Sequence, residues 1–467
     1  MRPLPIANGD SPTPPAPARV GVISLGCPKN LVDTEVLLGR VAERHVVCAD
    51  PEDADVVIVN TCGFIDQARE ESLEAIAEVT RWKEEGRIRG VVVAGCLAQR
   101  WGERLRTEHP GVDSVIGMAE YERIGEVLAA LSARDLAQQV QAPWRTLVAR
   151  DPTFPVGDQG GRLRVTPPHY AYLMVSDGCD NACTFCSIPS FRGLFRSKPR
   201  EVVLREAREL VASGAVELNL ISQDLTDWGK DIPGSGGLAG LLEDLAGIEG
   251  LRWIRLLYAY PGHVSDRLIA ALRDLPQVVP YLDIPIQHIS TPVLKRMGRR
   301  HTREETVALL ERLRAEVPDL VLRTTFICGF PGSTRQHFDE LLDFVRAFRF
   351  ERLGAFPYSV EPGTPAGERF SDDVPPEEKA ARVDELMRVQ QEIAFDHAEA
   401  QVGKTVDVLV EGTDEAGRLV GRSVHDAPEI DCSVVLARWD EEPDVGTIVP
   451  VKVIGSVGYD LIGACGE

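Results

Sequence analysis

Short apolar runs alternate with longer helix-like stretches through most of this chain, and that alternation restricts its possible folds more than any other feature. Near the amino terminus the apolar runs cover residues 20–25, 55–59 and 91–94. Continuous runs of this kind are typical of parallel strands that are covered on both faces. Helical stretches separate them, for example 66–82, for which Asp66 is the expected N-cap. The pattern predicts a small α/β domain with a parallel sheet over residues 19–134.

A second alternating series follows residues 135–164, a stretch of Pro, Gly and polar residues that is expected to be a linker. Its candidate strands cover 170–175, 216–222, 253–259, 281–286, 320–327 and 352–357. The helical stretches between them include 199–213, 264–275, 302–315 and 334–349. Six βα units predict a partial, TIM-like (β/α)6 barrel over 165–397 rather than a closed eightfold one. A long polar helix is expected from 375 to about 400, at the end of this series.

The sequence changes character once more near residue 398. From there to residue 467, β-branched and polar residues alternate between turns that carry glycine, which predicts a small antiparallel β-barrel. From residue 401 onward, five lysines and arginines stand against thirteen acidic residues, and the whole chain has a net charge of −21. So acidic a surface favours a basic protein partner over bulk nucleic acid, although solubility alone would also account for it.

The first residues indicate where the protein works. Residues 1–18 are rich in Pro and small residues and lack the apolar core of a secretion signal, so they are expected to form a disordered leader. No apolar run approaches the roughly 20 residues that a membrane span needs. We therefore expect a cytoplasmic protein without a membrane partner. In a reducing cytoplasm, clustered cysteines are more often metal ligands or catalytic groups than disulfides.

Three of the ten cysteines follow the first candidate strand of the middle domain, in the loop CDNACTFC. Cys179, Cys183 and Cys186 have the spacing that lets three thiolates bind three irons of one [4Fe–4S] cluster and leave one iron open. An open iron can chelate S-adenosylmethionine (SAM), which one electron then cleaves to a radical. The position fits, because barrel enzymes carry their chemistry at the C-terminal strand ends. A zinc loop is the alternative, but its fourth ligand would have to come from elsewhere.

Three further cysteines each follow an apolar run of the N-terminal domain, namely Cys27, Cys62 and Cys96. Parallel strands end side by side, so three loops can bring three thiolates to one point. Glycine flanks each cysteine and would let the backbone approach a bulky ligand, at Gly26, Gly63 and Gly95. A lone cysteine is usually an ordinary buried residue, but the same placement on three strands predicts a second three-thiolate cluster. The remaining cysteines are expected to be structural or incidental: Cys48, Cys328, Cys432 and Cys465.

Together these motifs resemble those of the methylthiotransferases, a family of radical SAM enzymes. The resemblance rests on 26–30 (GCPKN), 60–63 (NTCG), 94–96 (AGC), 178–189 (GCDNACTFCSIP) and 191–193 (FRG). It implies an auxiliary [4Fe–4S] cluster on the N-terminal trio, a SAM-coordinating [4Fe–4S] cluster on the Cys179 trio, and a TRAM-type tail. It also implies a reductase system that supplies electrons and a separate sulfur donor. Because the clusters carry the chemistry, no catalytic side chain is predicted.

Two branches of that family differ in their substrate. The MiaB-like branch modifies a tRNA adenosine and usually reads GCQMN where this chain reads GCPKN. Residues 176–193 (SDGCDNACTFCSIPSFRG) resemble the RimO-type branch, which adds sulfur and a methyl group to the β-carbon of an aspartate in small-subunit ribosomal protein twelve. The chain departs from that branch at Asn181 and Ala182, where a basic residue is common. The acidic tail favours the ribosomal protein; tRNA modification and a non-catalytic iron–sulfur sensor or RNA-binding protein are the alternatives.

Residues at the ends of other candidate barrel strands are expected to contact SAM: Gln223, Asp224, His288, Gly329, Pro331 and Gly332. The glycine-containing turn resembles the SAM-contacting turn of the family. Each residue also has a structural interpretation. Asp224 would cap a helix, His288 and its neighbour Gln287 would stabilise the strand end, and the turn would be an ordinary βα connection. Phe185 would shield the cluster, or simply pack within its loop.

Two groups of basic residues complete the candidates. Arg192 and Arg196 could bind a carboxylate, or belong to a solvated loop. A second group forms a basic cluster in an acidic chain: Lys295, Arg296, Arg299 and Arg300. In the tRNA alternative this cluster would bind phosphate. Otherwise it is a solvated helix face whose charges pair with Asp or Glu.

Overall fold

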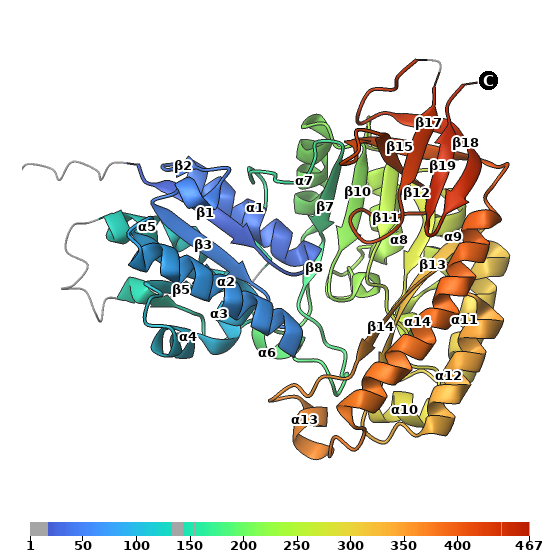
Figure 1. The fold of residues 1–467 in the computed structure, drawn as a ribbon, viewed down its shortest axis with the longest axis horizontal. Coiled ribbons are helices and arrows are strands. Elements are labelled where there is room, and N and C mark those ends of the chain that lie inside the picture. Colours follow the sequence, from blue (N-terminus) through green and yellow to red (C-terminus); the bar gives the residue numbers. More distant parts are fainter. Residues whose placement is uncertain (1–16, 133–142, 154–155, 440, 467) are drawn as a thin grey trace, which may run out of the picture. The chain divides into compact units, whose positions relative to one another are not determined.

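The computed structural model describes residues 17–132, 143–153, 156–439 and 441–466. The chain divides into two compact units, one formed by residues 1–150 with 161–163, the other by residues 151–160 with 164–467 (Figure 1). Residues 1–16 of the predicted leader lie outside the described residues. Ala18, within the predicted leader, is already buried beside the first strand.

The first unit contains the predicted parallel sheet, with strand order β2-β1-β3-β4-β5-β6. The strands are β1 (Arg19–Ser24), β2 (Val46–Val47), β3 (Val56–Thr61), β4 (Gly90–Ala94), β5 (Ser114–Ile116) and β6 (Thr146–Leu147). All its described pairings are parallel. Every side chain of β3 and β4 is buried, as continuous apolar runs covered on both faces require.

The helices of this unit are α1 (Pro28–Ala42), α2 (Asp66–Glu84), α3 (Gly95–Trp101), α4 (Glu103–Glu108) and α5 (Ile124–Ser132). Two expectations are corrected. Asp66 is the first residue of α2, and the N-cap is Ile65, which offers no side-chain bond; Asp66 acts through its charge in the first turn. The stretch expected to be a linker contains β6, which pairs with β5. Two residues are too few for a periodic signal.

The second unit contains the partial barrel, an open sheet of six strands in the order β14-β13-β12-β11-β10-β7. The strands are β7 (Tyr170–Met174), β10 (Glu217–Ile221), β11 (Trp253–Leu256), β12 (Val278–Asp283), β13 (Val321–Cys328) and β14 (Arg352–Pro357). All five pairings are parallel. The (β/α)6 prediction is confirmed.

Longer helices alternate with these strands: α7 (Arg200–Ala212), α8 (Gly237–Ala246), α9 (Asp266–Asp274), α11 (Arg303–Glu316), α12 (Arg335–Phe348) and α14 (Pro376–Glu399). Helix α8, which begins in a glycine-rich segment, is one of the helices that the six βα units require, but its range was not given from the sequence. Short elements lie at the strand ends: β8 (Ser176–Asp177), α6 (Ile188–Arg192), β9 (Arg196–Ser197), η5 (Leu225–Asp227), η6 (Pro261–His263), α10 (Thr291–Arg296) and α13 (Pro365–Arg369). Leucines of β10 belong to the main core of this unit.

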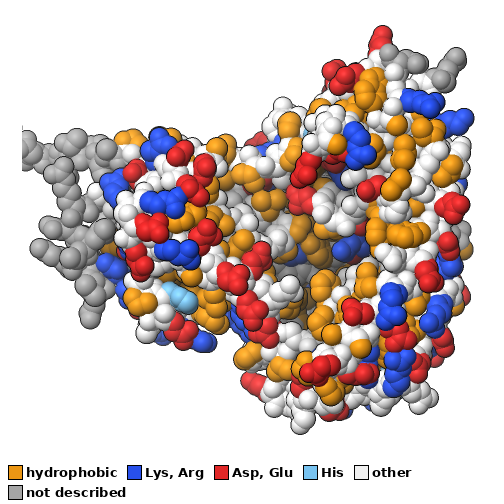
Figure 2. Space-filling view, in the orientation of Figure 1, with side chains coloured by type: hydrophobic (Ala, Val, Ile, Leu, Met, Phe, Trp, Pro, Cys, Tyr) orange, Lys and Arg blue, Asp and Glu red, His pale blue; other side chains and the backbone are white. Residues whose placement is uncertain are grey.

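The tail forms the predicted antiparallel barrel, closed in the order β15-β16-β17-β19-β18. Its strands are β15 (Thr405–Thr413), β16 (Leu419–Ser423), β17 (Val434–Arg438), β18 (Ile448–Val457) and β19 (Asp460–Ala464). One pairing, β17 with β19, is parallel. Figure 2 shows acidic and apolar side chains mixed on the visible face of this part of the chain.

Buried ion pairs attach the tail to the N-terminal ends of the barrel strands. Glu217, the first residue of β10, is fully buried between Arg255 (2.8 Å) and Arg422 of the tail (2.6 Å). Burial alone would favour its neutral form, but the two guanidinium groups hold the pKa of Glu217 below its usual value. Arg352, the first residue of β14, pairs with the buried Asp426. Removing one partner of such a buried pair costs about 3–5 kcal/mol.

Candidate functional site

The loop with Cys179, Cys183 and Cys186 lies at the C-terminal end of β7, where the barrel opens. The Cys179 N–H donates to the Gly193 carbonyl at 3.2 Å, and the Cys186 N–H donates to the Cys183 carbonyl at 3.2 Å. The loop enters through Gly178, whose φ is +75°. A Cβ there would lie 2.1 Å from the carbonyl oxygen of Leu194, so only glycine fits this approach.

The thiols of this loop sit in a poorly solvated place. Burial raises the pKa of Cys179 to about 11, even though the Asn181 N–H lies 3.4 Å from its Sγ. Burial also raises the pKa of Cys186 well above its usual value. The guanidinium of Arg299 approaches Cys183, with Nη1 3.7 Å from Sγ. Both raised thiols are therefore protonated without a metal, and metal binding would release protons.

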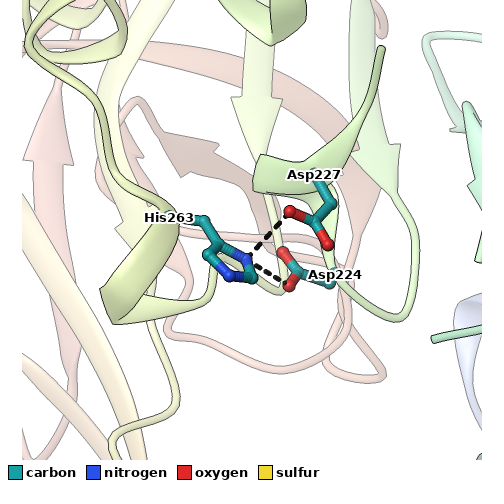
Figure 3. A group of neighbouring side chains, drawn as sticks. All are labelled: Asp224, Asp227 and His263. Carbon is teal, nitrogen blue, oxygen red and sulfur yellow. Dashed lines mark hydrogen bonds and ion pairs between the residues drawn. The ribbon is translucent and has the colours of Figure 1, made fainter. Parts of the chain in front are cut away.

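Asp224, Asp227 and His263 form an ion-pair group beside this loop, and their side chains point toward one another (Figure 3). His263 Nδ1 lies 2.9 Å from Asp224 Oδ2 and 3.0 Å from Asp227 Oδ1. Hydrogen bonds to these two carboxylates raise the pKa of His263 to about 9. At neutral pH the ring of His263 therefore carries a proton and forms ion pairs with both carboxylates.

This ion-pair group also holds the cysteine loop. The amide of Asn181 donates to Asp224 Oδ2 at 2.7 Å. Lys230 lies 2.5 Å from Asp227 and 3.0 Å from Asp180, so it ties the loop to the same group. The two residues between Cys179 and Ala182 are thus anchored to the end of β10. Nothing in the sequence pattern identified His263 or Lys230, because the contacts join separate strand ends.

We expect the ion pairs of His263 to stabilise the protein up to mildly alkaline pH. The folded pKa of about 9 exceeds the unfolded value of about 6.5. The contribution is therefore complete below about pH 6.5 and is lost as the pH rises through about 9. The free energy of unfolding should differ more between the protein and H263Q at pH 6 than at pH 10. An imidazole that titrates at or below its ordinary value, measured by NMR, would contradict this.

The predicted SAM contacts follow the ends of three barrel strands, β10, β12 and β13. Gln223 donates from Nε2 to Asp177 at 2.8 Å, while its Oε1 is buried without a partner. Asp224 is the N-cap of η5 and accepts from the Thr226 N–H at 3.1 Å, as its structural interpretation required. His288 is 1% exposed, and its Nδ1 accepts from the Ser290 N–H at 3.0 Å. Burial lowers the pKa of His288 to about 3, so the ring is neutral.

The Lys379 and Arg296 side chains pack against the glycine-containing turn that follows β13. Gly329 and Gly332 have φ values of +74° and +80°. A Cβ at Gly329 would lie 2.4 Å from the Lys379 side chain, and one at Gly332 would lie 2.8 Å from Arg296 Nε. The Pro331 carbonyl accepts from Arg296 Nε at 3.0 Å. The turn is therefore close-packed from one side by two cations.

Arg192 and Arg196 both face a carboxylate of this chain. Their nearest guanidinium nitrogens lie 3.4 and 3.3 Å from Asp177. Arg192 is buried, so the alternative of a solvated loop is wrong for it. Phe185 is half-buried and meets Phe330 edge-on, with ring centroids 6.4 Å apart.

The other cysteines lie outside this loop. Cys328 ends β13 within the main core and is 1% exposed, as expected. Cys48 packs against the core of the first unit. Cys432 and Cys465 are half-exposed in the tail.

In the first unit, Cys27, Cys62 and Cys96 follow three adjacent strands. Residues Ser24, Asn60 and Ala94 stand in register at the ends of β1, β3 and β4. Cys27 is the N-cap of α1, and Cys96 lies in the first turn of α3. The three loops therefore leave the same edge of the sheet.

Glycines bring these loops into contact. A Cβ at Gly26 would lie 3.0 Å from Cys62 Sγ, and a Cβ at Gly63 would lie 3.2 Å from the carbonyl carbon of Cys96. A Cβ at Gly95 would lie 2.4 Å from the carbonyl oxygen of Thr61. Each glycine thus permits the approach of a neighbouring cysteine loop, and the predicted approach to a bulky ligand stays a prediction.

Two buried asparagines hold these loops in place, a role that the sequence reasoning missed. Asn30 donates to the Leu25 carbonyl at 2.6 Å, and Asn60 donates to the Asn30 carbonyl at 2.8 Å. Both are 0% exposed, and both side-chain oxygens lack a partner. Their place in the GCPKN and NTCG motifs was the available signal.

The donor chemistry of both cysteine trios fits an iron–sulfur cluster better than a single ion. Among the described residues, the Asp224 group is the only set of three potential ligands within 4.8 Å of one another. Each trio supplies three thiolates, which cubane irons take at separate corners, and lacks the fourth ligand of a structural zinc site.

Three family models match consecutive parts of the chain. Residues 19–117 match the uncharacterized protein family UPF0004, residues 173–345 the radical SAM superfamily, and residues 402–465 the TRAM domain. The radical SAM assignment implies a [4Fe–4S] cluster and SAM as cofactors. Within the described residues, no helix combines the length and apolar character that a membrane crossing requires.

Curated relatives extend the similarity over nearly the whole chain. A Geobacter sulfurreducens protein named ribosomal protein uS12 methylthiotransferase RimO is 46% identical over 451 residues, 96% of this chain and 98% of the relative. A Symbiobacterium thermophilum protein of the same name is 44% identical over 97% of this chain and 92% of the relative. The solved radical SAM methyltransferase TsrM from Kitasatospora setae shares the fold, with a TM-score of 0.54 at 16% identity over 75% of this chain and 76% of that one. The chain belongs to the RimO family of radical SAM methylthiotransferases.

Proposed function

We propose that this protein inserts sulfur and a methyl group at the β-carbon of an aspartate in ribosomal protein uS12. The observation that carries the proposal is a CxxxCxxC loop held at the mouth of a six-stranded barrel, in a chain that shares 46% identity with a uS12 methylthiotransferase. We assign residues 19–134 to the auxiliary-cluster domain, 165–397 to the radical SAM core and 398–467 to the TRAM-like barrel, and the matched ranges fall inside these limits.

Cys179, Cys183 and Cys186 would hold the cluster that coordinates SAM. When bound, that cluster supplies the electron that cleaves SAM to a carbon-centred radical. The residues around it position the loop: Arg299 approaches Cys183, and Asn181 is tied to Asp224.

We also propose that residues at the C-terminal ends of the barrel strands contact SAM: Gln223, Asp224, His288, Gly329, Pro331 and Gly332. The support is strongest for Gln223, because its buried Oε1 is without a partner beside the cysteine loop. Such an acceptor suits the amino or hydroxyl groups of SAM. The uncharged His288 ring would contact SAM through packing and would add no charge to the site.

Cys27, Cys62 and Cys96 would hold a second [4Fe–4S] cluster, the carrier of the sulfur to be transferred. The support is the contact between their loops and the two buried asparagines that fix them. Protein side chains would exclude water, since Cys62 and Cys96 are 8% and 7% exposed. A sulfur donor and a reductase would complete the turnover.

The acidic tail supports a ribosomal protein as substrate. Thirteen acidic residues against five lysines and arginines would attract a basic protein and repel a tRNA backbone. The relatives named for uS12 agree with this choice over a tRNA adenosine.

The test is mass spectrometry of uS12 and nucleoside analysis of tRNA, in cells with and without the gene. We expect one aspartate of uS12 to gain the mass of a methylthio group only when the gene is present, with unchanged tRNA nucleosides. A methylthiolated adenosine that depends on the gene, with unmodified uS12, would instead establish the tRNA alternative.

A further inference from the structure

The four basic residues near α10 stand out in an acidic protein because none of them is neutralised. We call Lys295, Arg296, Arg299 and Arg300 the basic patch. Lys295, Arg296 and Arg300 are exposed, and Arg299 is 8% exposed. Within the described part of the chain, none of the four forms an ion pair. The expectation of a helix face paired with Asp or Glu is therefore wrong for this cluster.

The basic patch packs directly on the cysteine loop. The Thr184 N–H donates to the Met297 carbonyl at 2.9 Å, and the Thr184 hydroxyl donates to the Arg296 carbonyl at 2.8 Å. A Cβ at Gly298 would lie 2.2 Å from the Ala182 carbonyl oxygen. The exposed cations thus belong to the segment that touches residues 182–184, inside the CxxxCxxC loop.

Arg299 links the patch to a ligand position. Its Nη1 lies 3.7 Å from Cys183 Sγ, and its Nη2 donates to the Pro285 carbonyl at 2.6 Å. Its guanidinium also lies over the Tyr260 ring, 4.3 Å from the centroid. The buried Arg299 side chain therefore connects the exposed cations of the basic patch to Cys183 of the cysteine loop.

We propose that the basic patch is the docking surface for an acidic one-electron carrier protein, a flavin or iron–sulfur protein. This inference rests on the proposed function, which needs an electron at the cluster held by the Cys179 loop. In the complex the carrier would give up one electron and be oxidised, and the cluster that Cys179, Cys183 and Cys186 would hold would accept that electron, with no bond formed or broken.

The positive charge of the patch favours an acidic carrier over the other partners. The basic uS12 substrate would be repelled by the patch and attracted by the acidic tail. An RNA would be attracted by the four cations of the patch but repelled by the rest of the chain, whose net charge is −21. Electron-transfer complexes are small and transient and depend on electrostatic steering, which a few unpaired cations can supply.

The charge-reversal variant K295E/R300E tests the proposal, since it leaves Arg296 and Arg299 in their packed positions. A matched control, R208E/R252E, reverses two exposed arginines that also make no ion pair among the described residues. The probe is flavodoxin, an acidic FMN protein. Binding of the oxidised probe is measured by calorimetry, and SAM cleavage is measured with reduced flavodoxin and, separately, with dithionite.

We expect K295E/R300E to bind flavodoxin at least tenfold more weakly at low salt and to lose at least tenfold in flavodoxin-driven cleavage. Dithionite-driven cleavage should stay within twofold, and the control should match the unaltered protein. The difference between variant and control should shrink at high salt.

Three results would overturn the docking surface: unchanged flavodoxin binding in K295E/R300E, equal weakening in the control, or loss of affinity for tRNA without loss of affinity for flavodoxin. A fall in dithionite-driven cleavage equal to the flavodoxin-driven fall would assign the patch to the cysteine loop itself and would also overturn it. Absence of SAM cleavage by the unaltered, reconstituted protein with dithionite would count against the proposed function, while the binding measurement would still decide the docking surface.

Discussion

Replacing Cys183 with alanine is expected to lower reductive SAM cleavage below about 1% of the unaltered rate. Removing a residue that merely supports a metal ligand costs about 10–100-fold, and removing a ligand should exceed that range. Cys183 is the trio member closest to Arg299 and is only half-buried, so the substitution leaves a small surface change. The measurement is 5′-deoxyadenosine formed per chain after anaerobic reconstitution.

Cys465→Ala is the matched control for this experiment, because Cys465 is also half-buried but lies in the tail barrel. It should retain full cleavage and an iron content of about eight per chain. A soluble C183A protein that still cleaves SAM at a comparable rate would exclude Cys183 as a ligand.

The second large effect separates the two clusters. Cys62→Ala is expected to leave SAM cleavage within a few-fold of the unaltered rate while thiolation of uS12 falls to background. Iron should drop from about eight to about four per chain, because one of two four-iron clusters is lost. Since Cys62 is replaced by a slightly smaller apolar side chain, the stability cost should be on the order of 1 kcal/mol.

Cys48→Ala controls for a cysteine change in the same unit, because Cys48 packs against its core away from the three strand ends. It should retain both activities. If folded C62A lost SAM cleavage together with thiolation, or kept thiolation, the division of labour between the two trios would be wrong.

The sequence was most informative where one residue type recurred at equivalent strand ends. The six barrel strands and α14 were located from their apolar or amphipathic runs, although an end of β11 and both ends of β12 differ from the prediction by three residues. The cysteines after β1, β3 and β4 could be expected to lie at one edge of the sheet, because these strands are neighbours in register. Strand β6 escaped prediction, since it has only two residues.

The contacts that surround the cysteine loop could not be predicted from the sequence. His263 was not singled out because its partners, Asp224 and Asp227, follow a different strand. Asp224 was correctly assigned a capping alternative, but its bond to Asn181 depends on the path of the cysteine loop. Likewise the spacing of the basic cluster gave no indication that its charges lack partners, because ion pairing depends on side chains from distant elements.

The ion pairs beneath the barrel strands limit how this protein can be recombined. A tail taken from a tRNA-modifying relative would supply a different surface, but it would also have to supply counterparts of Arg422 and Asp426 for Glu217 and Arg352. Without them Glu217 would keep only Arg255 as its partner, and Arg352 would lose its pairing with Asp426. The substrate preference of such a chimera can therefore be interpreted only when the transplanted tail keeps an arginine at position 422 and an aspartate at position 426.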